Sequence, residues 1–116
     1  MFALFIVVNY PEYLEDILSK LVNLGVKGAT ILDSQGMGSA IVQQGIDSIP
    51  IFGSLKTLLS GSNPYSKTIF TIINEEHLLH ETMHDVEKIF QMDKKTQAGL
   101  MFTVPVSEVR FLGYKK

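Results

Sequence analysis

Two glycines around a methionine, Gly36-Met37-Gly38, are the residues of this sequence best suited to hold a ligand. They follow a short apolar run, and a glycine backbone can approach an anion closely and adopt positive φ at no cost. Successive backbone N–H groups in such a turn can therefore bind a phosphate or a carboxylate. The same residues also suit a chain that simply leaves a strand, because a bare Gly-x-Gly is a weak signal.

Three histidines recur at helical spacing, and imidazole is a common ligand of transition metals. They are His77, His80 and His84. The apolar residues of the same predicted helix lie on its opposite side: Leu79, Met83, Val86 and Phe90. We therefore expect the histidines to face solvent, with metal binding kept as the less favoured reading.

Catalytic groups are not arranged for a reaction in this sequence. The acidic residues form no recognisable acid/base pair, and Ser107-Glu108 lacks the strained turn that exposes a nucleophilic serine. The absence of cysteine excludes disulfides, thiol catalysis and thiolate metal sites, and it is compatible with a reducing cytoplasm. The sequence therefore predicts a cytoplasmic protein that is not an enzyme.

The length of 116 residues fits one domain, residues 1–116, and the 46% hydrophobic and 19% charged residues are typical of a globular protein. The net charge of -2 and the scattered Lys and Arg argue against nucleic acid as a partner. The apolar start, Phe2–Val8, is too short to span a bilayer, so we expect no direct membrane insertion. It reads better as a buried strand.

The first half of the chain predicts a strand, a helix and a second strand. Phe2–Val8 is a continuous β-favouring run, and Pro11 suits the first position of the helix that follows it. Gly25 is placed to end that helix in the left-handed region. Gly28–Asp33 supplies the second strand.

The second half repeats this order after a long loop at residues 39–66, for which a short helix near Gly53–Leu59 is expected. Lys67–Ile73 predicts the third strand, and Asn74 suits the N-cap of the second helix. The predicted fourth strand is Leu100–Val106, with a short edge at Val109–Leu112.

These elements predict a ferredoxin-like βαββαβ sandwich of the α+β class. It has a four-stranded antiparallel sheet, two helices on one face and a long loop between strands 2 and 3. The apolar first strand also demands a cover on the other face of the sheet, and no residues remain to build one. Another copy of the chain is the natural cover.

Several motifs at matching spacing resemble the PII signal-transduction proteins (nitrogen regulatory protein P-II). Gly25-Val-Lys-Gly28-Ala-Thr30 followed by Gly36-Met-Gly38 is similar to their GVxGMT…GFG signature. Met101-Phe-Thr-Val-Pro-Val106 is similar to their IFVxPV strand, and Pro11 matches the proline that opens their first helix.

The resemblance implies a homotrimer that binds adenine nucleotides in clefts between subunits, with ATP, ADP or AMP as candidates. It also implies that the long loop acts on a partner protein such as an enzyme or a membrane transporter. By position, the implied ligand-binding residues are Thr30, Gly36, Met37, Gly38, Gly99 and Arg110.

The chain also departs from the PII pattern at ligand-binding positions. Ala40 stands where the family has a glutamine, Leu100 follows Gly99 where a lysine is expected, and Arg110 alone remains of a basic pair. The long loop has no YRGAEY-like modification site, so uridylylation is not supported. Because a triphosphate needs several donors and cations in one place, the sequence predicts an altered small anionic ligand.

The main hypothesis is therefore a PII-like trimeric regulator that binds a small anionic ligand between subunits. One alternative is a trimer without a small ligand that serves as a fixed docking surface. The other is a metal-binding trimer resembling the CutA type, which depends on the three histidines.

Overall fold

The computed structural model describes residues 1–38, 65–91 and 97–113. Its elements in chain order are β1 (Phe2–Val8), η1 (Pro11–Tyr13), α1 (Leu14–Asn23), β2 (Thr30–Ser34), β3 (Ser66–Ile73), α4 (Glu76–Gln91) and β4 (Gly99–Pro105). The short helix expected near Gly53–Leu59 and most of the loop at residues 39–66 lie outside the described residues.

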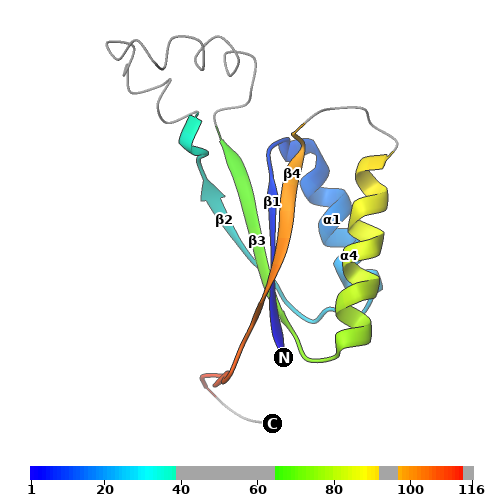
Figure 1. Cartoon of the computed structure of the whole chain (residues 1–116), viewed down its shortest axis with the longest axis vertical. Helices are drawn as coiled ribbons and strands as arrows, with labels where there is room; N and C mark the ends of the chain where they lie inside the picture. Colours follow the sequence, from blue (N-terminus) through cyan, green and yellow to red (C-terminus); the bar gives the residue numbers. More distant parts are fainter. Residues whose placement is uncertain (39–64, 92–96, 114–116) are drawn as a thin grey trace.

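The four strands form one antiparallel sheet in the order β2-β3-β1-β4. Figure 1 shows α1 and α4 together on one side of this sheet. The two β-α-β units interleave, so that β1 and β3 lie in the centre while β2 and β4 form the edges. This arrangement confirms the predicted ferredoxin-like fold.

The first helix begins and ends as the sequence predicts. Pro11 opens the short η1 turn that leads into α1, where its missing N–H is no loss. Gly25 has a φ of 87°, in the left-handed region. The N–H of Gly25 bonds to the carbonyl of Val22 at 3.1 Å and that of Val26 to Leu21 at 3.0 Å, which is a Schellman motif.

Three predicted boundaries differ from the structure. The first backbone bond of α4 runs from the Leu79 N–H to the Glu75 carbonyl, so Asn74 lies one residue before the cap. β2 starts at Thr30 rather than Gly28, because the Gly28 carbonyl accepts the Thr71 hydroxyl. The edge strand expected at Val109–Leu112 is wrong, since these residues are not a strand and pair with no strand among the described residues.

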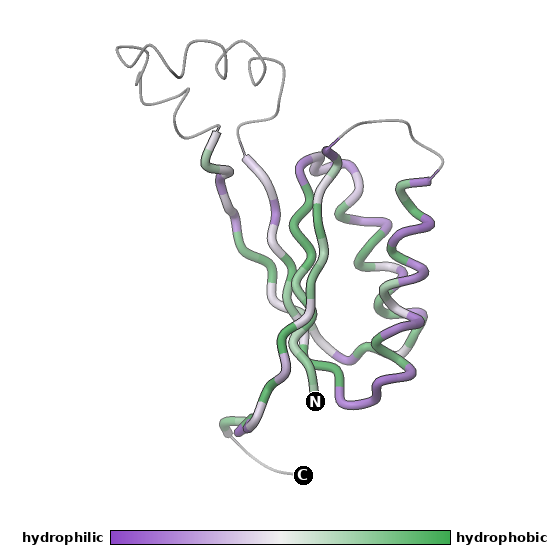
Figure 2. Tube along the Cα trace, in the orientation of Figure 1, coloured by the Kyte–Doolittle hydropathy of each residue, from purple (hydrophilic) through white to green (hydrophobic). Residues whose placement is uncertain are grey.

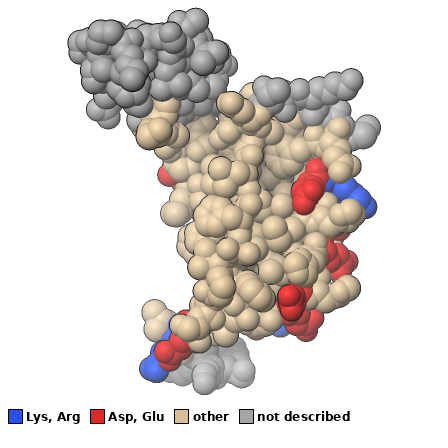
Figure 3. Space-filling model, in the orientation of Figure 1, with Lys and Arg blue, Asp and Glu red and all other residues tan. Residues whose placement is uncertain are grey.

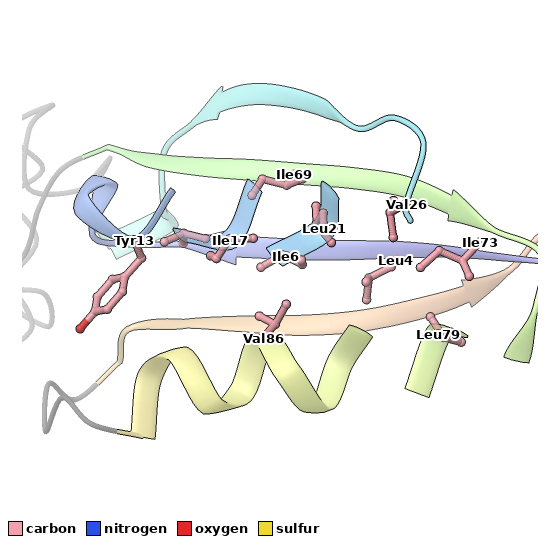
Figure 4. Packing of buried hydrophobic residues seen from close by; sticks show 11 residues of the cluster. Leu4, Ile6, Tyr13, Ile17, Leu21, Val26, Ile69, Ile73, Leu79 and Val86 are labelled. Carbon is pink, nitrogen blue, oxygen red and sulfur yellow. The ribbon is translucent and has the colours of Figure 1, made fainter. Parts of the chain in front are cut away.

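The core lies between the sheet and its two helices (Figure 4). Alternate residues of β1 and β3 face the helices because side chains alternate along a strand. The buried members are Leu4, Ile6, Val8, Tyr13, Ile17, Leu21, Val26, Ile69, Ile73, Leu79 and Val86. Figure 2 shows the apolar segments gathered along the central strands, with the polar stretches of α4 turned outward.

The helix-free side of the sheet, which we call the open face, is also apolar. Register places Phe5 of β1 beside Phe70 of β3 and Phe102 of β4. The ring centroids of Phe5 and Phe102 are 4.9 Å apart and stacked, and those of Phe5 and Phe70 are 5.8 Å apart. The neighbouring rows of this face carry Ala3, Val7, Leu32, Ile72, Leu100 and Val104. No described helix covers this aromatic row in one copy.

Candidate functional site

The predicted glycines lie at the same end of the sheet but on opposite edges. Gly36 and Gly38 follow the end of β2, whereas Gly99 begins β4. One ladder row links Asp33, Lys67, Val8 and Gly99 across all four strands. Asp33 and Gly99, at the two ends of this row, are separated by three strand spacings, or about 14 Å. One copy therefore does not bring the two glycine regions together.

Hydroxyl groups tie β2 to β3 where the long loop leaves the sheet. Ser34 Oγ lies 2.7 Å from Ser66 Oγ and 2.8 Å from Thr68 Oγ1. On the other side of the sheet, Lys67 Nζ donates a hydrogen bond to the Asp33 carboxylate. These bonds fix the chain at residues 34 and 66, immediately beside Gly36-Met37-Gly38, with Met37 exposed.

Thr30 lies in a hollow of about 740 Å³ at the side of the sheet. The hollow opens where β3 continues beyond the start of β2. Its floor includes Phe70 and Ile72, and its wall is the chain between Gly25 and Thr30, with Asn74, Glu75 and Phe111 at other points of the rim. Thr71 Oγ1 donates to the Gly28 carbonyl and so holds this wall against β3. A hydroxyl beside aromatic and aliphatic surface suits a small planar ligand with polar groups.

Phe111 lines the same hollow, and Arg110, which does not line it, directly precedes Phe111 in the chain. The Arg110 guanidinium is engaged with Glu108, whose Oε1 lies 2.8 Å from both Nε and Nη2. Both side chains are largely exposed. The structure therefore associates Thr30 with the segment that carries Arg110, and neither Gly36-Met37-Gly38 nor Gly99 lines this hollow.

Gly99 has a packing role that the sequence did not reveal. A Cβ added at Gly99 would stand 2.0 Å from the Val7 carbonyl oxygen, so no side chain fits there. Asn9 holds the approach to β4, because its backbone N–H bonds to the Ala98 carbonyl at 2.8 Å and its Nδ2 to the Gln97 carbonyl at 2.6 Å. Asn9 follows β1 directly, and its position after a strand was the available signal for a turn contact.

Two of the three histidines of α4 lie near glutamates on the same helix, and His84 is exposed. His77 Nε2 lies 3.7 Å from Glu81 Oε2, and His80 Nε2 lies 3.7 Å from Glu76 Oε1, each at i,i+4 spacing. These side chains face solvent, as the sequence predicts. Across residues 1–38, 65–91 and 97–113 no three metal-binding side chains gather into a possible site.

The sheet order and the single helix layer define a ferredoxin-like α+β protein with two open sheet edges. Residues 2–114 match the family model described as Nitrogen regulatory protein P-II, and the chain therefore belongs to the P-II family. This confirms the resemblance found in the sequence motifs. The family is one of regulatory proteins, in accordance with the predicted signalling role.

A solved structure shows the same fold. The crystal structure of Arabidopsis thaliana PII bound to citrate aligns with a TM-score of 0.59 at 16% identity, covering 91% of this chain and 77% of that one. No curated protein sequence matches the chain. In the part of the chain that the structure describes, no helix is long and apolar enough to cross a membrane.

Proposed function

We propose that this protein is a cytoplasmic P-II regulator that assembles as a homotrimer and binds a small anionic ligand between its copies. The ligand signal passes through residues 39–66 to a partner protein, such as an enzyme or a transporter. The observation that carries this proposal is the split site. Gly36-Met37-Gly38 and Gly99 stand at the same end of the sheet on opposite edges.

Edge-to-edge assembly accounts for the split. If the β2 edge of one copy meets the β4 edge of the next, Gly38 of one copy faces Gly99 of its neighbour. Such a head-to-tail contact uses two different surfaces and closes into a ring when the rotation permits. Both edges carry exposed apolar side chains, Leu32 on β2 and Leu100 on β4. Exposed apolar edge strands favour aggregation of an isolated copy, whereas they suit an interface between copies.

The chemistry of the hollow beside Thr30 supports a nucleotide of low charge. Phe70 and Ile72 offer an apolar surface for a planar base, and Thr30 offers a hydroxyl. On the opposite edge, Leu100 replaces the lysine that the resemblance expects after Gly99, and Arg110 is already paired with Glu108. ADP and AMP are therefore better candidates than ATP, and the citrate held by the Arabidopsis protein supports a small anion more generally.

Calorimetric titration of the protein with ATP, ADP, AMP and citrate tests this function. Thr30→Val removes the hydroxyl from the hollow with little change in shape and should weaken nucleotide binding by about tenfold. Thr103→Val is the matched control, because Thr103 lies on β4 outside the hollow. An absence of heat with all four compounds would exclude the nucleotide and citrate versions of this function.

The Glu108–Arg110 pair gives a second test of the same site. Glu108 competes with an anionic ligand for the Arg110 guanidinium, so Glu108→Gln should tighten anion binding by roughly two- to fivefold. Arg110→Gln should weaken it by at least as much. Equal affinity in both variants would place Arg110 outside the site.

The packing of Gly99 favours one alternative function, a trimer that has no small ligand and serves as a docking surface. The close approach of the Val7 carbonyl oxygen is enough to explain why residue 99 is a glycine, so no phosphate contact is needed to explain it. This alternative predicts the same melting temperature with and without each nucleotide, whereas a ligand that binds the folded state raises it.

A further inference from the structure

The charge of this protein is divided unevenly along its sequence. The two helices with their flanks, residues 11–23 and 75–91, carry eight of the twelve acidic residues and two of the ten basic ones. The net charge of this helix layer is therefore -6, and that of the remaining chain is +4. Figure 3 shows the acidic side chains along the side of the molecule where α4 lies.

Within this acidic layer, α1 carries an apolar groove whose Leu14 and Leu18 are partly buried against the core and whose Val22 is exposed. The groove has a volume of about 680 Å³. Its apolar members recur every three or four residues: Pro11, Leu14, Leu18 and Val22. They follow one side of the helix over about 16 Å. Val22, at the C-terminal end of the groove, is 71% exposed.

The rim of the groove is acidic at its N-terminal half. Glu15 is the acidic residue that lines the groove, and Glu12 and Asp16, which do not line it, are exposed residues close to Glu15 in the chain. The one basic residue of α1 is Lys20. An apolar floor with an acidic rim is complementary to a helix that has an apolar stripe between basic residues.

We propose that the α1 groove docks a basic amphipathic helix of a partner protein, about three turns long. Its apolar side chains enter between Leu14, Leu18 and Val22, and its Lys or Arg residues meet Glu15 and its acidic neighbours. A second copy of this chain does not fit, because two helix layers of the same negative charge repel each other. The surface lies on the layer opposite the open face, so this inference does not depend on the proposed ligand or trimer.

Fluorescence anisotropy with a labelled 18-residue peptide tests the proposal. The peptide carries Leu at i, i+4, i+7 and i+11 with Lys at the other positions, and its control replaces every Lys with Glu. We expect the lysine peptide to bind and the glutamate peptide not to bind. Val22→Ser and Glu15→Lys should each weaken binding by about fivefold or more.

Glu81→Lys is the matched control, because it makes the same charge change on α4, away from the groove. It should alter the affinity by less than about twofold. Thermal unfolding of each variant verifies that the fold persists. The proposal is overturned if the lysine peptide does not bind, if Glu81→Lys weakens binding as much as Glu15→Lys, or if Val22→Ser has no effect.

Discussion

Phe102 offers the most direct test of the open face as a surface between copies. The residue ends the aromatic row on the β4 edge and remains 44% exposed in one copy. A phenylalanine side chain offers about 200 Å², so roughly 90 Å² is left for a neighbour to cover. At about 25 cal/mol per Å², that cover contributes roughly 2 kcal/mol per copy. A trimer would lose roughly 6 kcal/mol, or about four orders of magnitude in its association constant.

Phe102→Asp removes this contribution and adds the cost of burying a carboxylate. Sedimentation velocity over a range of concentrations should show a trimer for the native protein and a monomer for the variant. Val22→Asp is the control, since it places the same charge on an exposed apolar position of the helix layer and should leave the trimer intact. A Phe102→Asp protein that remains trimeric at the native concentration range would refute the assignment of the open face.

Thr82→Val should stabilise the fold by about 1 kcal/mol and raise the Tm by roughly 4 °C, because the buried Thr82 hydroxyl has no hydrogen-bond partner among the residues that the structure describes. Thr71→Val should lower the Tm, since Thr71 loses its bond to a backbone carbonyl; equal shifts in the two variants would contradict this reasoning. Gly99→Ala should cost roughly 1–3 kcal/mol in urea unfolding by forcing β4 away from Val7, and native stability would show that β4 shifts freely. Gly25→Ala should cost about 1 kcal/mol in the same assay, from its left-handed φ alone.

Local signals in the sequence were sufficient for the order of the elements. The apolar run Phe2–Val8 and the Gly25 stop both depend on neighbours in the chain, and both predictions are confirmed. Element boundaries that depend on contacts between residues far apart in the chain were harder to predict from the sequence. The start of β2 depends on Thr71, which is more than forty residues away and bonds the Gly28 carbonyl. Val109–Leu112 has the composition of a strand, but it pairs with none of the strands that the structure describes.

The candidate site was predicted only in part, for a similar reason. Motif spacing identified Thr30, and the structure places it in a hollow. Phe70 lies beside Thr30 because of the register between β2 and β3. This register could not be predicted from the sequence, since residues 39–64 separate the two strands in the chain. The packing role of Gly99 was likewise hidden, since it depends on the Val7 carbonyl across the β1–β4 ladder.

The hydroxyl and ion-pair bonds between β2 and β3 have an evolutionary consequence. They anchor Ser34 and Ser66 to each other, so the strands are joined independently of the segment between them. Doubling the length of an insert between two fixed ends costs only about 0.6 kcal/mol of chain entropy. Mutation can therefore lengthen, shorten or exchange this insert while the sheet is preserved. A lineage built on this scaffold could acquire new partners by replacing one segment, and a protein engineer could graft a reporter domain at the same place.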